Sequence, residues 1–134
     1  MNVLLTGGAG YIGSHAALSL LDSGHNVHII DNLSTGNETL IPKNARFTNC
    51  NINDEEKISE LIKENKFDLL MHFAGFIEVE ESVHDPEKYF KNNTDNAIKL
   101  FKICKKNNLS NIVFSSTAAA YGSIDENKLV DENT

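Results

Sequence analysis

Three glycines near the N-terminus have a spacing that is typical of anion binding. Residues 6–13 read TGGAGYIG, so Gly7, Gly10 and Gly13 lie three residues apart, between an apolar run and a helical pattern. Gly7 permits a tight turn out of a strand, Gly10 lets the backbone approach a pyrophosphate, and Gly13 lets a helix pack on that strand. The helix N-terminus would then face the anion with free N–H groups. Three glycines can also form a simple turn, but the strand before them and the helix after them favour dinucleotide binding.

An acid follows the glycine turn at the distance that suits a ribose. Asp31 ends the second apolar run, about 20 residues beyond the turn, where a carboxylate typically binds the adenosine ribose 2′-hydroxyl. Its charge would repel the 2′-phosphate of NADP, and no Lys or Arg between Asp31 and Lys43 offsets it. The sequence therefore favours NAD as the cofactor. The alternative is an Asp that only caps a turn at the end of a strand.

The elements that must position these residues follow from the alternation of apolar runs with amphipathic stretches. Strands are expected over residues 3–5, 27–30, 46–49, 68–73 and 111–114. Helices are expected over residues 12–21 and after the capping residues Asp54 and Asp85. Strands that alternate with helices form right-handed βαβ units and a parallel sheet. The predicted fold class is therefore α/β, a Rossmann-type doubly wound parallel sheet with the strand order 3-2-1-4-5.

The apolar side chains also predict part of the core. The helix after Asp85 is expected to bury one stripe made of Phe90, Ala97, Phe101 and Cys104. His72 lies inside an apolar strand, so we expect a hydrogen-bonded core histidine rather than a metal ligand.

The composition excludes several classes of protein. The 134 residues suffice for one domain, and a net charge of −7 with a single arginine, Arg46, argues against a nucleic-acid surface. No apolar run approaches the ~20 residues of a membrane span, and the N-terminus lacks a signal-peptide pattern. Cys50 and Cys104 have no metal-ligand spacing, so no metal is assigned and a reducing, cytoplasmic location is expected.

Five motifs along the chain carry a family resemblance. They are TGGAGYIGSH at residues 6–15, DNLS at 31–34, MHFAG at 71–75, YFKNN at 89–93 and FSSTAAAYG at 114–122. Over essentially its whole length the chain resembles the extended short-chain dehydrogenase/reductase superfamily, and within it the UDP-glucose 4-epimerases of the NAD-dependent epimerase/dehydratase family. The segment SSTAAAYG, taken with GYIGSH, is the specific part, since related dehydratases usually carry an acid after the Ser-Thr pair.

The resemblance implies an NAD site whose residues can be named. They are Tyr11 and Ile12 on the pyrophosphate with Gly7, Gly10 and Gly13 of the turn, Asp31 and Asn32 at the adenosine ribose, Asn51 and Ile52 at the adenine, Phe73, Ala74 and Gly75 under the nicotinamide half, Asn92 supporting the loops on the cofactor side, and Ser115 at the nicotinamide end. Thr117 would be the catalytic hydroxyl near the sugar C4 oxygen.

Three positions depart from the family pattern. Asn51 stands where an Asp usually bonds the adenine amino group, although an amide oxygen can still accept that bond. Ile77 stands where some members carry a Lys near the cofactor. The Tyr-x-x-x-Lys pair that should follow Thr117 is absent, because Tyr121 is followed four residues later by Asp125. We therefore expect residues 1–122 to be the first part of an NAD-binding domain, truncated before its last strands, and residues 123–134 to be a loop that leads into the missing catalytic region.

The resemblance implies an isomerase when the protein is full length. It would interconvert UDP-glucose and UDP-galactose in galactose metabolism through a 4-keto intermediate, with a Tyr base and with hydride passing to NAD and back. This chain, without the base and the substrate domain, would be inactive by itself. The alternatives are a related nucleotide-sugar dehydratase or reductase, and a non-catalytic NAD-binding module. The preferred UDP-sugar and the oligomeric state stay open, with a homodimer as one option, and no nucleic-acid or membrane partner is expected.

Overall fold

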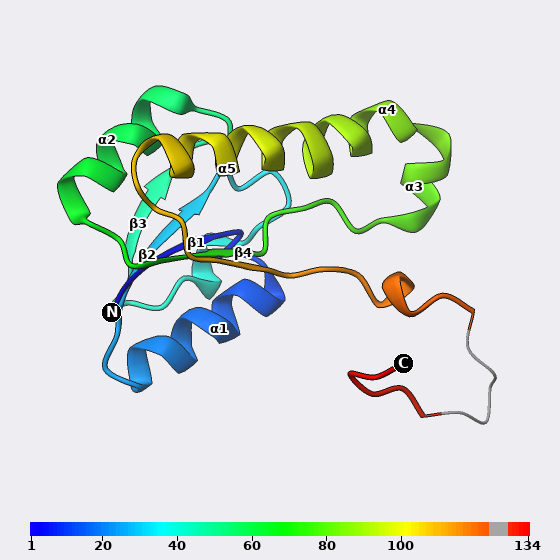
Figure 1. Cartoon of the computed structure of the whole chain (residues 1–134), viewed down its shortest axis with the longest axis horizontal. Coiled ribbons are helices and arrows are strands. Elements are labelled where there is room, and N and C mark those ends of the chain that lie inside the picture. Colours follow the sequence, from blue (N-terminus) through cyan, green and yellow to red (C-terminus); the bar gives the residue numbers. More distant parts are fainter. Residues whose placement is uncertain (124–128) are drawn as a thin grey trace.

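All strands of this computed structural model, which describes residues 1–123 and 129–134, lie in one parallel sheet (Figure 1). The strands are β1 (Asn2–Thr6), β2 (Asn26–Asp31), β3 (Arg46–Asn49), β4 (Leu69–His72) and β5 (Ile112–Phe114). Their order is β3-β2-β1-β4-β5, and Val3 of β1 is in register with Val27 of β2 and Leu69 of β4. The predicted α/β class, the Rossmann fold and the strand order are confirmed.

The helices lie on both faces of this sheet. They are α1 (Tyr11–Asp22), α2 (Glu55–Asn65), α3 (Val79–His84), α4 (Pro86–Tyr89) and α5 (Asn96–Lys106), with 3-10 turns at Glu38–Leu40 and Ala118–Tyr121. Figure 1 shows α1 on one face and α2 and α5 on the other. The expected caps are present, since Asp54 accepts from the N–H of Lys57 and Asp85 from that of Lys88. Within the described residues no helix is long and apolar enough to cross a bilayer.

Two apolar layers hold the sheet between these helices. Because alternate strand residues point to opposite faces, Leu5 and Ile29 pack toward Ala17 of α1, while Leu4 and Ile30 pack toward α2 and α5. All five side chains are fully buried. Each large aliphatic residue contributes roughly 1.5–3 kcal/mol by leaving water. The carboxyl ends of β1 and β2, where the candidate ligand site lies, are therefore rigidly supported.

One expectation about the core was wrong. Ala97 and Cys104 are buried and Phe101 is partly buried, but Phe90 is 68% exposed. The cause is a π-helix over Phe90–Asp95, directly before α5. The i→i+5 hydrogen bonds of a π-helix place one more residue in a turn than an α-helix does. Phe90, at the start of this turn, is therefore rotated away from the buried stripe of α5. The same segment directs asparagine side chains toward the end of the sheet.

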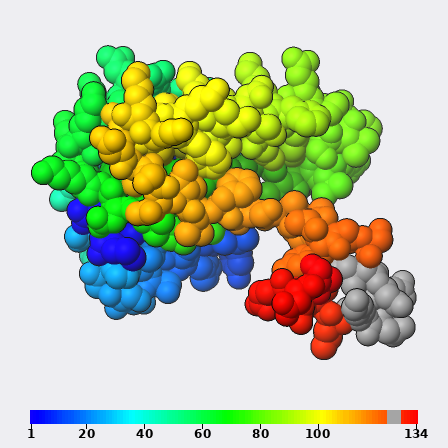
Figure 2. All heavy atoms as spheres, viewed as in Figure 1, coloured from blue at the N-terminus to red at the C-terminus, as the bar shows by residue number. Residues whose placement is uncertain are grey.

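The chain beyond Phe114 leaves the body of the molecule. The three side chains of β5 are between 38% and 52% exposed, and residues 115–123 are exposed throughout. Figure 2 shows this segment, in orange, running along the outside of the molecule.

Candidate functional site

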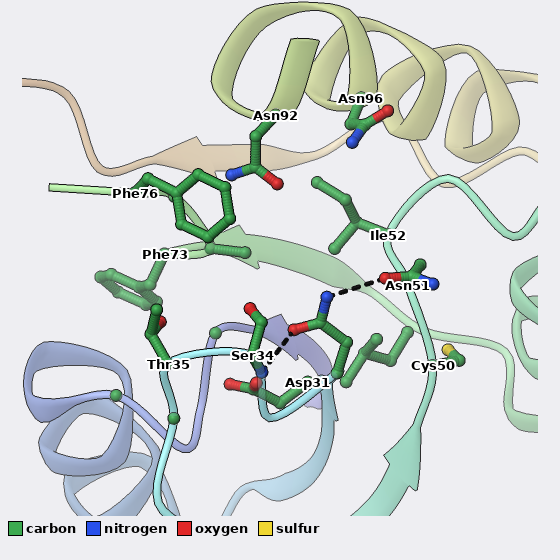
Figure 3. Close-up of a pocket in the computed structure, with 17 residues that line it drawn as sticks. Asp31, Ser34, Thr35, Cys50, Asn51, Ile52, Phe73, Phe76, Asn92 and Asn96 are labelled. Carbon is green, nitrogen blue, oxygen red and sulfur yellow. Dashed lines mark hydrogen bonds between the residues drawn. The ribbon is translucent and has the colours of Figure 1, made fainter. Parts of the chain in front are cut away.

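A pocket lies at the carboxyl ends of the central strands (Figure 3). Ten predicted cofactor residues line it, namely Gly7, Gly10, Asp31, Asn32, Asn51, Ile52, Phe73, Ala74, Gly75 and Asn92. They come from the glycine turn, the ends of β2 and β3, the segment after β4 and the π-helix. The strand order reverses between β1 and β4, and parallel α/β sheets bind their ligands at such a switch point.

Two positions of the glycine turn, Gly7 and Gly13, have no room for a larger residue. Gly7 adopts a φ of +74°, and a Cβ added to it would lie 2.6 Å from the backbone nitrogen of Ala74. A Cβ added to Gly13 would lie 2.2 Å from the carbonyl oxygen of Gly7, so this glycine is required for α1 to pack on the turn. Gly10 is the N-cap of α1 and lines the pocket. The amides of the first helical turn, which have no intrahelical partner, therefore begin at the pocket and suit an anion.

Asp31 joins the glycine turn to the loop after β2. Asp31 is 9% exposed, and its carboxylate accepts from the backbone N–H of Ala9 at 3.0 Å and from that of Leu33 at 2.8 Å. Gly36 closes the same loop onto the turn, because a Cβ there would lie 2.8 Å from the Cβ of Ala9 and 3.1 Å from Asp31 Oδ1. Asp31 thus caps its turn and also lines the pocket, and its role at the ribose stays a prediction. Gly36 was not predicted from the sequence.

Two side-chain amides connect the ends of β2 and β3 at the rim of the pocket. The backbone N–H of Ser34 donates to Asn32 Oδ1 at 3.0 Å, and Asn32 Nδ2 donates to Asn51 Oδ1 at 2.7 Å. Figure 3 shows both hydrogen bonds as dashed lines. The rim therefore consists of groups whose donors and acceptors are already oriented.

Asn93 of the π-helix clamps the segment that leaves β4. Its Oδ1 accepts from the backbone N–H of Phe76 at 2.8 Å, and its Nδ2 donates to the carbonyl of Phe76 at 2.9 Å. Asn92 Nδ2 also donates to Asn93 Oδ1 at 2.8 Å. Both Phe76 and Asn92 line the pocket. Sequence reasoning missed Asn93 and Phe76, since nothing in their spacing of 17 residues indicates a contact.

Five predicted site residues lie outside the pocket lining. Tyr11 and Ile12 are 76% and 61% exposed at the start of α1, and Gly13 packs against Gly7. Ser115 is exposed, and its N–H donates to the carbonyl of His72 at 3.0 Å. The fifth is Thr117.

Thr117 has a local role in this structure. Its side-chain oxygen accepts from the N–H of Ala119 at 3.2 Å and caps the short 3-10 turn Ala118–Tyr121. The proposed role of Thr117 in catalysis stays a prediction.

Buried titratable groups beside the pocket are structural. His72 is 2% exposed, its Nδ1 lies 2.6 Å from Thr6 Oγ1, and burial lowers its pKa to about 4. The expected core histidine is therefore present and neutral. Burial raises the pKa of Cys104 to about 11, so this thiol behaves as a small apolar side chain. Across residues 1–123 and 129–134, no cluster of three His, Cys, Asp or Glu could hold a metal ion.

Comparison with known proteins identifies the family to which this arrangement belongs. The sequence model of the NAD dependent epimerase/dehydratase family matches residues 3–134. The expected cofactor, NAD, is the one that this family description names.

Individual relatives agree with the family match. The chain is 45% identical to a UDP-glucose 4-epimerase of Corynebacterium glutamicum over 93% of its own length and 37% of the relative's. It is 40% identical to a probable UDP-arabinose 4-epimerase of Arabidopsis thaliana over 97% of its length and 34% of the relative's. The Thermus thermophilus UDP-glucose 4-epimerase, solved in complex with NAD, superposes with a TM-score of 0.90 at 35% identity, covering 99% of this chain and 43% of that chain. The chain thus spans about two-fifths of these relatives or less.

Proposed function

The chain belongs to the NAD dependent epimerase/dehydratase family, and we propose that it is the NAD-binding part of a UDP-sugar 4-epimerase that interconverts UDP-glucose and UDP-galactose. The observation that carries this proposal is Asp31, whose carboxylate is fixed against the glycine turn at the switch point of the sheet. That geometry suits a dinucleotide whose pyrophosphate lies on α1 and whose ribose lies on an acid.

The residues at this end of the sheet fit the parts of NAD in order. The first turn of α1, whose Tyr11 and Ile12 are exposed outside the pocket lining, would hold the pyrophosphate through its backbone N–H groups. Asp31, which lines the pocket, would hold the adenosine ribose. The adenine ring would then reach the residues that follow β3. The nicotinamide half would lie over residues 73–75, with Asn92 beside it. The absence of a side chain at Gly10, which lines the pocket, would let the backbone approach the phosphates closely.

The chemistry divides between the cofactor and the protein. NAD, when bound, takes a hydride from the sugar carbon and returns it. Thr117 would donate a hydrogen bond to the reacting sugar oxygen, and Ser115 would lie near the nicotinamide end. Tyr121 lacks a lysine four residues later, so we place the general base outside residues 1–134 and residues 1–122 in the first part of the NAD-binding domain. A cytoplasmic location is part of the proposal and is supported by two buried, unpaired cysteines.

A second substrate is favoured by one comparison. A probable UDP-arabinose 4-epimerase is 40% identical to this chain. Both sugars therefore belong in the test.

The test is an enzymatic assay of the protein that is expressed from the complete gene, in which residues 1–134 are included. The protein would be purified from a strain that lacks its own epimerase and supplied with NAD and either UDP-galactose or UDP-arabinose. We expect conversion to the 4-epimer, and no turnover by residues 1–134 alone. A dehydrated or reduced product would favour the related enzymes of the family, and NAD binding without any turnover would favour a non-catalytic module. Full activity of residues 1–134 would mean that a base lies within them, with Tyr121 the first candidate.

A further inference from the structure

We propose that Asn32 fixes the orientation of the Asn51 amide, and that this pair selects adenine over a base without an exocyclic amino group. The inference rests on the NAD site proposed above and concerns its specificity. The two residues lie at the ends of adjacent strands, β2 and β3, and their side chains meet at the rim of the pocket.

The position of the base follows from the positions of the other cofactor groups. With the pyrophosphate at the start of α1 and the ribose at Asp31, the chain of the dinucleotide runs from β1 across the end of β2. The group beyond the ribose therefore reaches the carboxyl end of β3. Cys50, Asn51 and Ile52 follow β3 directly and line the pocket there.

A backbone group that cannot be inverted determines the orientation of both amides. The N–H of Ser34 is a donor, so the Asn32 atom 3.0 Å away must be its oxygen. The nitrogen of Asn32 then faces Asn51 at 2.7 Å, and the Asn51 atom that meets it must also be an oxygen. The nitrogen of Asn51 is turned away from this contact, as Figure 3 shows. If Asn51 rotated by half a turn about its amide, two N–H groups would face each other.

The consequence is an acceptor at a defined place. Asn51 Oδ1 has two lone pairs, of which Asn32 uses one, and the other is available to a donor on the base. Adenine offers the N–H of its amino group. Hypoxanthine has a carbonyl oxygen at that position, so two acceptors would face each other without a proton between them. A free asparagine could rotate its amide group to suit either base. The amide of Asn51 would lose its hydrogen bond to Asn32 if it rotated in this way.

The test compares NAD with nicotinamide hypoxanthine dinucleotide, in which an oxygen replaces the adenine amino group. Both dinucleotides would be titrated into the cofactor-free protein that is expressed from the complete gene. The readout is the ratio of the two Kd values. We expect the parent protein to prefer NAD by about tenfold, the effect of losing one hydrogen bond to a group that the bound base covers. The ratio is informative because damage to the site, or added charge, weakens both dinucleotides alike.

Asn32→Asp gives the sharpest outcome. One Asp oxygen would still accept from Ser34, but the other would now face Asn51 and require its nitrogen. The second N–H of that nitrogen would then meet the base, so the preference should disappear or shift toward hypoxanthine. Asn32→Ala, which removes the anchor, should reduce the preference to about twofold or less. Asn51→Asp is the matched control, because a carboxylate remains an acceptor and should preserve the preference for NAD.

The outcomes separate this inference from the proposed function. Asn32 is exposed, so the variants should fold, and thermal unfolding would verify this. If the parent binds NAD without preference, or if Asn32→Asp binds both dinucleotides with the parental ratio, the inference is overturned and the NAD site stands. If the parent binds neither dinucleotide, the proposed function is overturned together with the inference.

Discussion

The carboxylate of Asp31 accepts a hydrogen bond from the backbone N–H of Ala9 at 3.0 Å, which joins the acid at the end of β2 to the glycine turn at the end of β1. A second bond, from the N–H of Leu33, occupies the other carboxylate oxygen. The residue that should choose between NAD and NADP is therefore also a structural residue, and its substitution should affect both binding and stability.

Asp31→Asn tests both effects, on cofactor binding and on stability, while it keeps the size of the side chain. The amide has one acceptor for two backbone N–H groups, so we expect the free energy of unfolding to fall by about 1–3 kcal/mol. Removing the charge should also narrow the preference for NAD over NADP. Chemical denaturation and calorimetric titration would measure the two effects, with Asp22→Asn at the end of α1 as the charge-matched control. Equal affinities of the parent for NAD and NADP would refute the electrostatic argument.

Gly13→Ala and Gly10→Ala should have different consequences. The Cβ at position 13 would lie 2.2 Å from a backbone oxygen, whereas that at position 10 would lie 3.3 Å from the same atom, the carbonyl oxygen of Gly7. We expect Gly13→Ala to lower the free energy of unfolding by about 1–3 kcal/mol or more, the usual cost of overpacking. Gly10→Ala should largely preserve stability and weaken NAD binding, because Gly10 lines the pocket. Equal stability of the two variants would contradict this assignment.

Asn93→Ala tests the clamp on the segment that leaves β4. The substitution leaves the N–H and the carbonyl of Phe76 without their side-chain partner, so a loss of about 1–3 kcal/mol in unfolding free energy is expected. Asn93→Asp keeps the acceptor for the N–H of Phe76 but places an oxygen against the Phe76 carbonyl, so it should also lose stability. Thermal unfolding with and without NAD would detect both effects. If the clamp contributes nothing to stability, the parent, Asn93→Ala and Asn93→Asp would unfold at the same temperature.

His72 should make stability depend on pH. Burial lowers its pKa to about 4 in the folded protein, against about 6.5 in an unfolded chain, so the unfolded state binds the proton first as the pH falls. The stabilisation is complete above pH about 6.5 and is lost progressively down to pH about 4, by as much as about 3 kcal/mol.

The measurement is the free energy of unfolding between about pH 4 and about pH 7, for which the parent is compared with His72→Gln. Glutamine keeps a polar partner for Thr6 but does not titrate, so the variant should lose less stability over this range. The same substitution at exposed His84 is the matched control. Parallel curves for the parent and His72→Gln would show that this histidine is not the source of the pH dependence.

Thr117→Val in the complete protein tests the proposed catalytic hydroxyl. The variant keeps the shape and removes the oxygen, so kcat should fall by about 10²–10⁴, the range for a positioned proton-transfer group. Since Thr117 also caps the 3-10 turn Ala118–Tyr121, the loss of the cap should cost about 0.5–2 kcal/mol. Thr117→Ser should retain most activity. Parental kcat in Thr117→Val would make Thr117 a capping residue only.

The sequence by itself determined the framework of the site. Apolar runs and stripes with a period of 3.6 are local properties, so they predicted the strands and the helices α1 and α2 and the helix after Asp85, although not α3. The alternation of these elements then predicted the order of the sheet. The structural roles of Gly7 and Gly13 were predictable because the close contacts of the backbone at these positions exclude a side chain. Strand ends were less certain, since the sequence suggested residues 68–73 where β4 is Leu69–His72.

Only the tertiary structure decided which polar groups meet around the pocket. The contacts between Asn32 and Asn51 and between Phe76 and Asn93 join segments 19 and 17 residues apart, and amide side chains have no periodicity that would reveal such pairs. The exposure of Phe90 likewise depended on a π-helix that interrupts an otherwise regular helical pattern. These features arise because loops and irregular turns adopt the conformation that satisfies their buried backbone groups, and the partners for those groups come from other parts of the fold.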